Sequence, residues 1–254
     1  MILNKNAEKL LKSRFSSKLP LLANCKELVA FTLAEVLITL LIIGIVASLV
    51  IPALIADTQK QEDYTRLLKA VSVVQNAANL IRVENGGRMA GLTNTHLDMA
   101  NLFAPKMNYI KFCKDESDSP NCYISNSADI YNLQGNPVAD ESPYYYRIYP
   151  KIVTSDGFIY TFQLLSSTCQ ATHYIVNGDP KSCAAVFVDV NGVKPPNTWG
   201  KDIFIIIIND NNTIVYGNSG GVDPSLHCQL PSTNKWNGDA CAGRAIIEGG
   251  IKYY

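Results

Sequence analysis

The chain has 254 residues with 22 basic and 22 acidic side chains, and 47% of its residues are hydrophobic. This much apolar chain can bury a core, which excludes a largely disordered protein. A formal net charge of zero gives no reason to expect nucleic acid as a partner, because domains that bind it usually carry a basic excess. The seven cysteines include no Cys-x-x-Cys pair, which argues against a zinc finger or a thioredoxin-like redox motif.

The N-terminal part of the chain has the pattern of a membrane anchor. Residues 1–30 carry six basic and two acidic side chains, a net of +4, and residues 36–56 form an uncharged run of 21 residues. A helix of about 20 apolar residues crosses the hydrocarbon core of a bilayer. The positive-inside rule then places the N-terminus in the cytoplasm and the chain after residue 57 on the other side.

This apolar run is too long for a cleavable secretory signal, whose apolar region has about 7 to 15 residues. Glu35 lies just before it, where an unpaired carboxylate costs at least about 2.5–3.5 kcal/mol. Two interpretations remain open from these residues. Either Glu35 lies close enough to the interface to be hydrated, or a cation meets it inside the membrane.

The segment AFTLAEVLI, residues 30–38, followed by Pro52, resembles the cleavage and methylation motif of type IV pilins and type II secretion pseudopilins. The resemblance implies that a prepilin peptidase cuts between Ala30 and Phe31 and methylates the new amine of Phe31. The family usually has Gly before the cut, whereas this chain has Ala30, which is also small. In the family, filaments form by packing of the N-terminal helices. The amine of Phe31 would then pair with Glu35 of a neighbouring subunit.

Four segments follow from this interpretation. Residues 1–30 are a leader removed by the peptidase, and residues 31–56 are the transmembrane and assembly half of a long helix. Residues 57–86 are its amphipathic half, with apolar side chains at three- and four-residue intervals until Gly86 and Gly87 stop it. Pro52 marks a bend or a loosened turn in this helix. Residues 87–254 form the exported head.

The head is predicted to be an α+β layer, with four or five antiparallel strands packed on the amphipathic half of the helix, as in pilins. Residues 89–138 read as an irregular connection with one short helix near His96 to Phe103. Asp-Gly and Asp-Asn-Asn turns separate apolar runs and indicate two hairpins. The predicted strands are 144–153, 158–165, 184–190, 204–208 and 213–216, and the all-apolar run 204–208 predicts a central strand buried on both faces.

Cleavage would remove Cys25 and leave six cysteines in an exported domain, which favours three disulfides. Fifteen connectivities are open, and free thiols are the alternative. Sequence neighbours give the simplest pairing, which joins Cys113 to Cys122, Cys169 to Cys183 and Cys228 to Cys241. The tail from Cys241 to Tyr254 reads as a last edge strand.

The most distinctive block of the head, residues 188–204, resembles a D-x-N-G…P-N…G-x-D-x-F pattern of prepilin-like proteins. Asp189, Asn191, Asn197 and Asp202 offer oxygen ligands of the kind that calcium takes, and some pseudopilins hold calcium in this region. The spacing is not that of an EF-hand. The alternative is that these side chains hydrogen-bond the backbone and shape a tight loop, which requires no cofactor.

The sequence therefore predicts a non-enzymatic filament subunit, a pseudopilin or minor pilin, anchored in the bacterial inner membrane by one span. By resemblance its partners are prepilin peptidase, other pilin or pseudopilin subunits, an inner-membrane assembly platform and membrane lipid. The alternative is a membrane-anchored binding or adhesin module that does not polymerise. An exported hydrolase has no supporting set of residues in the sequence.

Overall fold

The computed structural model describes residues 31–114, 122, 130–138, 148–172, 182–195, 197–218 and 224–254. The leader, with Ala30 and Cys25, lies outside these residues. The chain forms two compact units, with the boundary between Ile51 and Pro52.

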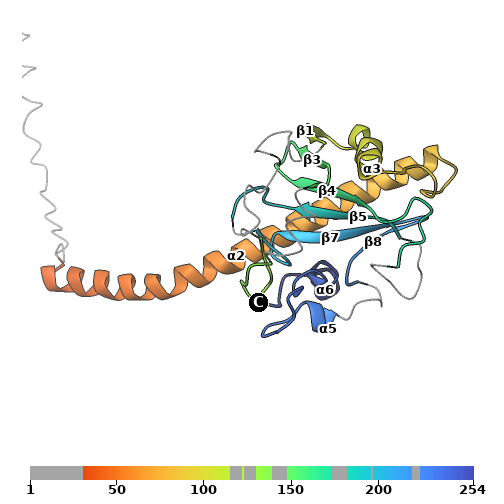
Figure 1. Ribbon diagram of the computed structural model, residues 1–254. Coiled ribbons are helices and arrows are strands. Elements are labelled where there is room, and N and C mark those ends of the chain that lie inside the picture. The colour runs from red at the N-terminus through yellow and green to blue at the C-terminus, as the bar shows by residue number, and fades with distance from the viewer. Residues whose placement is uncertain are drawn as a thin grey trace, which may run out of the picture. The chain divides into compact units, whose positions relative to one another are not determined.

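A single long helix, α2, runs from Leu33 to Glu84, and its part up to Ile51 belongs to the first unit (Figure 1). Among the described residues it is the one helix long and apolar enough to cross a membrane, and its most apolar stretch is not buried. The helix ends where predicted, because Gly86 and Gly87 have φ of 69° and 87° and the amide of Gly87 donates to the Arg82 carbonyl at 2.7 Å.

The second unit is built on one antiparallel sheet with the strand order β1-β3-β4-β5-β7-β8 (Figure 1). In register, Val186 of β5 lies opposite Phe162 of β4 and Ile206 of β7. The strands are β1 Tyr109–Cys113, β3 Lys151–Thr154, β4 Ile159–Leu164, β5 Ser182–Asp189, β7 Ile203–Asn209 and β8 Thr213–Val215. Two shorter strands, β2 Ile130–Tyr131 and β6 Asn197–Thr198, pair in parallel as a separate small sheet.

Both faces of the central strands are buried, as predicted for the run 204–208. Side chains at even positions of β5 and β7, such as Val186 and Ile206, pack in one cluster with the second half of α2. Side chains at odd positions, such as Phe187 and Ile205, pack in a second cluster with Trp199. From α2 the first cluster takes a stripe at helical spacing, namely Leu67, Ala70, Val71, Val74, Ala77, Ala78 and Ile81. The α+β layer is therefore confirmed.

The described residues of the second unit also contain four shorter helical segments. They are α3 His96–Phe103, the 3₁₀ turn η1 Ala104–Lys106, α5 Pro224–His227 and α6 Cys241–Glu248. The short helix predicted near His96 to Phe103 is confirmed. It begins at a capping box in which Thr95 and Asp98 satisfy each other's backbone amides.

Two expectations about the sheet are wrong. The main sheet has six strands instead of four or five, because β1 lies in the segment read as an irregular connection and pairs with β3. Of the predicted strand 144–153, residues 144–147 lie outside the described part, and β3 begins only at Lys151.

The prediction for the tail is also wrong, because residues 241–248 form the helix α6 instead of an edge strand. Its buried residues Cys241, Ala242 and Ala245 follow a helical spacing, and Arg244 pairs with Glu248 one turn later at 2.7 Å. Gly243 is needed at the contact, since a Cβ there would lie 2.0 Å from the carbonyl carbon of Gly217. The close approach of α6 to the end of β8 therefore requires glycine at this position.

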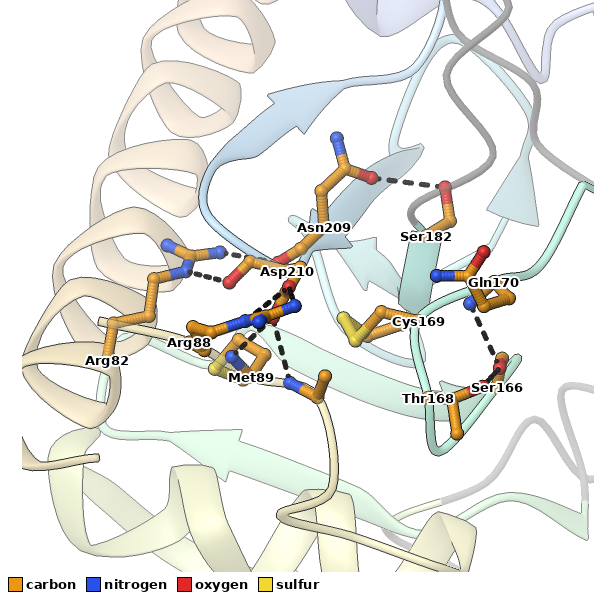
Figure 2. The surroundings of a disulfide bond; sticks show 12 residues. Arg82, Arg88, Met89, Ser166, Thr168, Cys169, Gln170, Ser182, Asn209 and Asp210 are labelled. Carbon is orange, nitrogen blue, oxygen red and sulfur yellow. Dashed lines mark hydrogen bonds and ion pairs between the residues drawn. A yellow bond between two sulfur atoms is a disulfide. The ribbon is translucent and has the colours of Figure 1, made fainter. Parts of the chain in front are cut away.

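The structure contains the three predicted disulfide pairs, Cys113–Cys122, Cys169–Cys183 and Cys228–Cys241. They close loops of 9, 14 and 13 residues in sequence separation. The second pair joins the loop after β4 to the start of β5, and Figure 2 shows its surroundings. Each bridge therefore fixes a local connection of the head.

Candidate functional site: the helix N-terminus, the head loop and the helix clamp

Glu35, the acidic residue of the prepilin-like motif, lies in the first turn of α2 and closes a capping box with Thr32. The Thr32 amide donates to Glu35 Oε2 at 2.8 Å, and the Thr32 hydroxyl donates to the same oxygen at 2.9 Å. In return the Glu35 amide donates to Thr32 Oγ1 at 3.2 Å. The carboxylate thus satisfies the Thr32 amide, the Thr32 hydroxyl satisfies the Glu35 amide, and the carboxylate lies at the positive end of the helix dipole.

This geometry places the carboxylate beside the predicted cleavage point. Glu35 Oε2 accepts from the backbone of Thr32, the residue directly after Phe31, and Phe31 itself is 80% exposed. The sequence interpretation missed the capping box, although a Thr followed three residues later by Glu before an apolar run is its usual signature. Pro52 lies within α2, which continues through it.

The four predicted calcium ligands are brought together in the loop around β6. Asp189 Oδ1 accepts from the amide of Asn191 at 3.1 Å, and Asp202 Oδ2 accepts from the Asn191 side-chain nitrogen at 3.0 Å. Asp202 Oδ1 also accepts from the amide of Thr198 at 2.5 Å. With its amide oriented to satisfy both neighbours, Asn197 donates to Asp189 Oδ2 and to the Gly192 carbonyl, each at 3.3 Å.

The two carboxyl groups are buried, and this changes their titration. Burial, reinforced by the charge of Asp202, raises the pKa of Asp189 well above its usual value. Burial also raises the pKa of Asp202 to about 7. In the part of the chain that the structure describes, no three His, Cys, Asp or Glu side chains cluster as metal ligands. Since the carboxylate oxygens already accept from nitrogens of the same loop, the geometry fits the loop-shaping interpretation better than a calcium site.

We expect calcium to leave the melting temperature of the protein unchanged. The measurement is a thermal melt at pH 8 with millimolar calcium and with chelator. This pH is the most sensitive choice, because the folded pKa of Asp202 lies above its unfolded value of 3.8. Protonation of Asp202 therefore stabilises the folded state fully below pH 3.8, and this stabilisation is lost as the pH rises through 7. A bound cation would raise the melting temperature most above pH 7, where the carboxylate is charged. A rise of several degrees with calcium that chelator reverses would contradict this expectation.

A buried arginine fixes the C-terminal end of α2 to the turn between β7 and β8 (Figure 2). Arg82 is 4% exposed. Its guanidinium donates to the carbonyls of Asn209 at 2.9 Å, Asp210 at 3.2 Å and Asn212 at 2.5 Å, and to the hydroxyl of Thr213 at 3.0 Å. A buried cation is tolerated here because nearly all its donors have acceptors.

The Asp210 side chain holds the segment that follows the helix. It accepts from the amides of Met89 and Ala90, each at 3.0 Å, and from Arg88 Nη2 at 2.6 Å (Figure 2). The hydrogen bond from Arg88 is the main reason that the pKa of Asp210 is lowered. We call Arg82 and Asp210, with the turn they hold, the helix clamp. The sequence gives no sign of it, because the acceptors of Arg82 belong to a segment more than 120 residues away.

The fold and these sites define a chain with one membrane-competent helix leading into a disulfide-bonded α+β head. Comparisons with protein-family models, with curated proteins and with solved structures found no match.

Proposed function

We propose that the chain is a structural, non-enzymatic subunit of a type IV pilus-like or type II secretion filament, a pseudopilin or minor pilin. The observation that carries the proposal is the combination of the Ala30–Phe31 motif with Glu35 at the N-terminus of an exposed apolar helix. A large apolar helix surface is unfavourable in water, whereas a filament buries it between packed helices.

In the proposed mechanism, prepilin peptidase cuts between Ala30 and Phe31 and methylates the new amine, which keeps its positive charge. Within the apolar core of a filament, this amine pairs with Glu35 of the neighbouring subunit. Each group is costly in lipid when alone, so the pairing favours the assembled state. The bonds from Thr32 to one carboxylate oxygen support this role, because they hold Glu35 at the helix end where the amine forms.

The proposed location follows from the charges and the cysteines. The basic leader stays in the cytoplasm, α2 crosses the inner membrane once, and the head lies in the periplasm or outside the cell. Three disulfides in the head agree with an oxidising compartment. The proposed partners are prepilin peptidase, other pilin or pseudopilin subunits and the inner-membrane assembly platform.

The rival proposal, an anchored binding module that never polymerises, needs neither a free amine at Phe31 nor an acidic residue beside it. Determining the N-terminus of the membrane-extracted protein separates the two. A start at Phe31 supports the filament subunit, and an intact N-terminus supports the simple anchor.

A further inference from the structure

Strand β4 extends beyond its neighbour β3, which leaves one of its backbone amides without a strand partner. In register, β3 pairs with β4 only as far as Thr161. Alternate amides of a strand face the same neighbour. The Phe162 amide donates to the Pro150 carbonyl at 3.0 Å, just before β3 begins. The next amide on that side belongs to Leu164, which lies past the paired residues and is partly buried, so it needs another acceptor.

A histidine side chain supplies that acceptor. The Leu164 amide donates to Nδ1 of His96 at 2.9 Å. His96 is the first residue of α3, which packs against β4 (Figure 1). A capping box fixes the start of this helix, and Phe103 at its end lies against Phe162 with ring centroids 5.2 Å apart. The imidazole is therefore held where a carbonyl of a longer β3 would lie.

The direction of this hydrogen bond fixes the protonation state of His96. A backbone amide can only donate, so Nδ1 is an acceptor without a proton and the proton of the neutral ring lies on Nε2. An imidazolium carries a proton on both nitrogens. Protonation of His96 would therefore point two N–H groups at each other and leave the Leu164 amide without its acceptor.

Among the described residues, no acidic group pairs with the imidazole of His96. The Asp98 carboxylate of α3 accepts from the two amides that precede the helix, at 2.9 and 3.2 Å. The ring of Tyr149 lies 4.4 Å from the imidazole between centroids, and its hydroxyl is itself hydrogen-bonded. At the other end of α3, Lys106 pairs with Glu84. Burial lowers the pKa of His96 below its usual 6.5.

We propose that His96 is a proton-sensitive latch between α3 and the end of β4. The latch is closed while the imidazole is neutral, and it opens when Nδ1 takes a proton and the Leu164 amide loses its acceptor. The bond from the Gly91 amide to the Ser167 carbonyl, at 2.7 Å, and the disulfide at Cys169 do not titrate, so the opening is local. The proposal goes beyond the proposed function and does not depend on it.

The direction of the pH effect follows from the lowered pKa. Stabilisation by the latch is complete above pH 6.5 and is lost as the pH falls through the folded pKa of His96. Asp202 acts in the opposite direction, because its raised pKa favours the folded state in acid. A thermal melt sums the two effects, so the test needs a readout at the latch itself.

The test uses the full chain in detergent micelles, with isotope-labelled histidine and leucine, between about pH 8 and 5. Nuclear magnetic resonance shows which ring nitrogen of His96 carries the proton. Hydrogen exchange of the Leu164 amide, corrected for its intrinsic dependence on pH, reports the latch. We expect Nδ1 to be unprotonated at neutral pH, and the protection of Leu164 to fall about tenfold as His96 takes its proton, as for the loss of one hydrogen bond.

Two variants make the test specific. In His96→Gln the side-chain oxygen can accept from the Leu164 amide but takes no proton, so the protection of Leu164 should stay level over this pH range. His227→Gln is the matched control, because it removes another partly buried histidine, which belongs to α5 and pairs with Asp239 at 2.9 Å. In this variant Leu164 should respond to pH as in the unchanged chain.

A His96 that titrates at or above its usual 6.5, or carries a proton on Nδ1 at neutral pH, overturns the proposal. A loss of Leu164 protection in acid that persists in His96→Gln also overturns it, because the loosening would then have another cause. The unchanged chain gives both readouts, so the proposal is decided even if a variant does not fold. An uncut N-terminus contradicts the proposed function and leaves the latch unaffected.

Discussion

Replacing Glu35 with Ala should leave the chain in the membrane but deplete it from filaments at least tenfold. The variant helix is more apolar, so insertion is retained. In the filament, however, the amine of Phe31 would lose its partner in a medium where an unpaired charge costs at least about 2.5–3.5 kcal/mol. The measurement compares the amount of subunit in sheared or cross-linked filaments with the amount in the membrane fraction.

The capping box supplies the matched control. Thr32→Ala removes the two hydrogen bonds of the Thr32 hydroxyl, one to Glu35 Oε2 and one from the Glu35 amide, but keeps the carboxylate of Glu35 and its bond from the backbone amide of residue 32. This variant should assemble nearly as well as the original, because the lost cap costs about 1 kcal/mol and the charge pair remains. Equal depletion of both variants would show that the cap, and not the charge, matters. Normal assembly of Glu35→Ala would refute the pairing mechanism.

The second large effect is expected at the helix clamp. Arg82→Met fills a similar volume but leaves the buried carbonyls of the β7–β8 turn without their donor. Hydrogen bonds to a charged group are worth about 1.5–3 kcal/mol, and buried acceptors left unpaired cost about as much. We expect a loss of about 3 kcal/mol in the free energy of unfolding, which lowers the melting temperature by about 10 °C. Tryptophan fluorescence on heating in detergent measures it.

Arg88→Met is the control for this change, because Arg88 contacts Asp210 of the same turn but lies on the surface. Its side chain is 70% exposed and pairs with Asp210 at 2.6 Å. Exposed pairs contribute about 1 kcal/mol or less, and Asp210 keeps its two backbone donors. The melting temperature should fall by no more than about 3 °C. If Arg88→Met proved as damaging as Arg82→Met, burial would not explain the strength of the clamp.

The features predicted from the sequence are those with a long, simple signal. The run of 21 uncharged residues and the apolar stripe after it predicted α2 to within two residues of both ends. The all-apolar run around Ile206 predicted a strand buried on both faces, and the spacing of the cysteines predicted the three disulfides.

The features that were missed depend on contacts between distant residues. Strand β1 is short and half-exposed, and its partner β3 follows about 40 residues later, so no local pattern indicates it. The helix of the tail packs closely against Gly217 through Gly243, a contact that the sequence of the tail does not reveal. The burial of Arg82 has no local signal, because its acceptors are backbone carbonyls of another segment.

The most direct test of the central claim is the N-terminal sequence and mass of the protein extracted from membranes of a host with prepilin peptidase. The filament-subunit account predicts a chain that starts at Phe31 with a methylated amine, and it predicts that the chain stays uncut when the peptidase is inactivated. A membrane-extracted protein that keeps its N-terminus at Met1 in the presence of active peptidase would contradict the account.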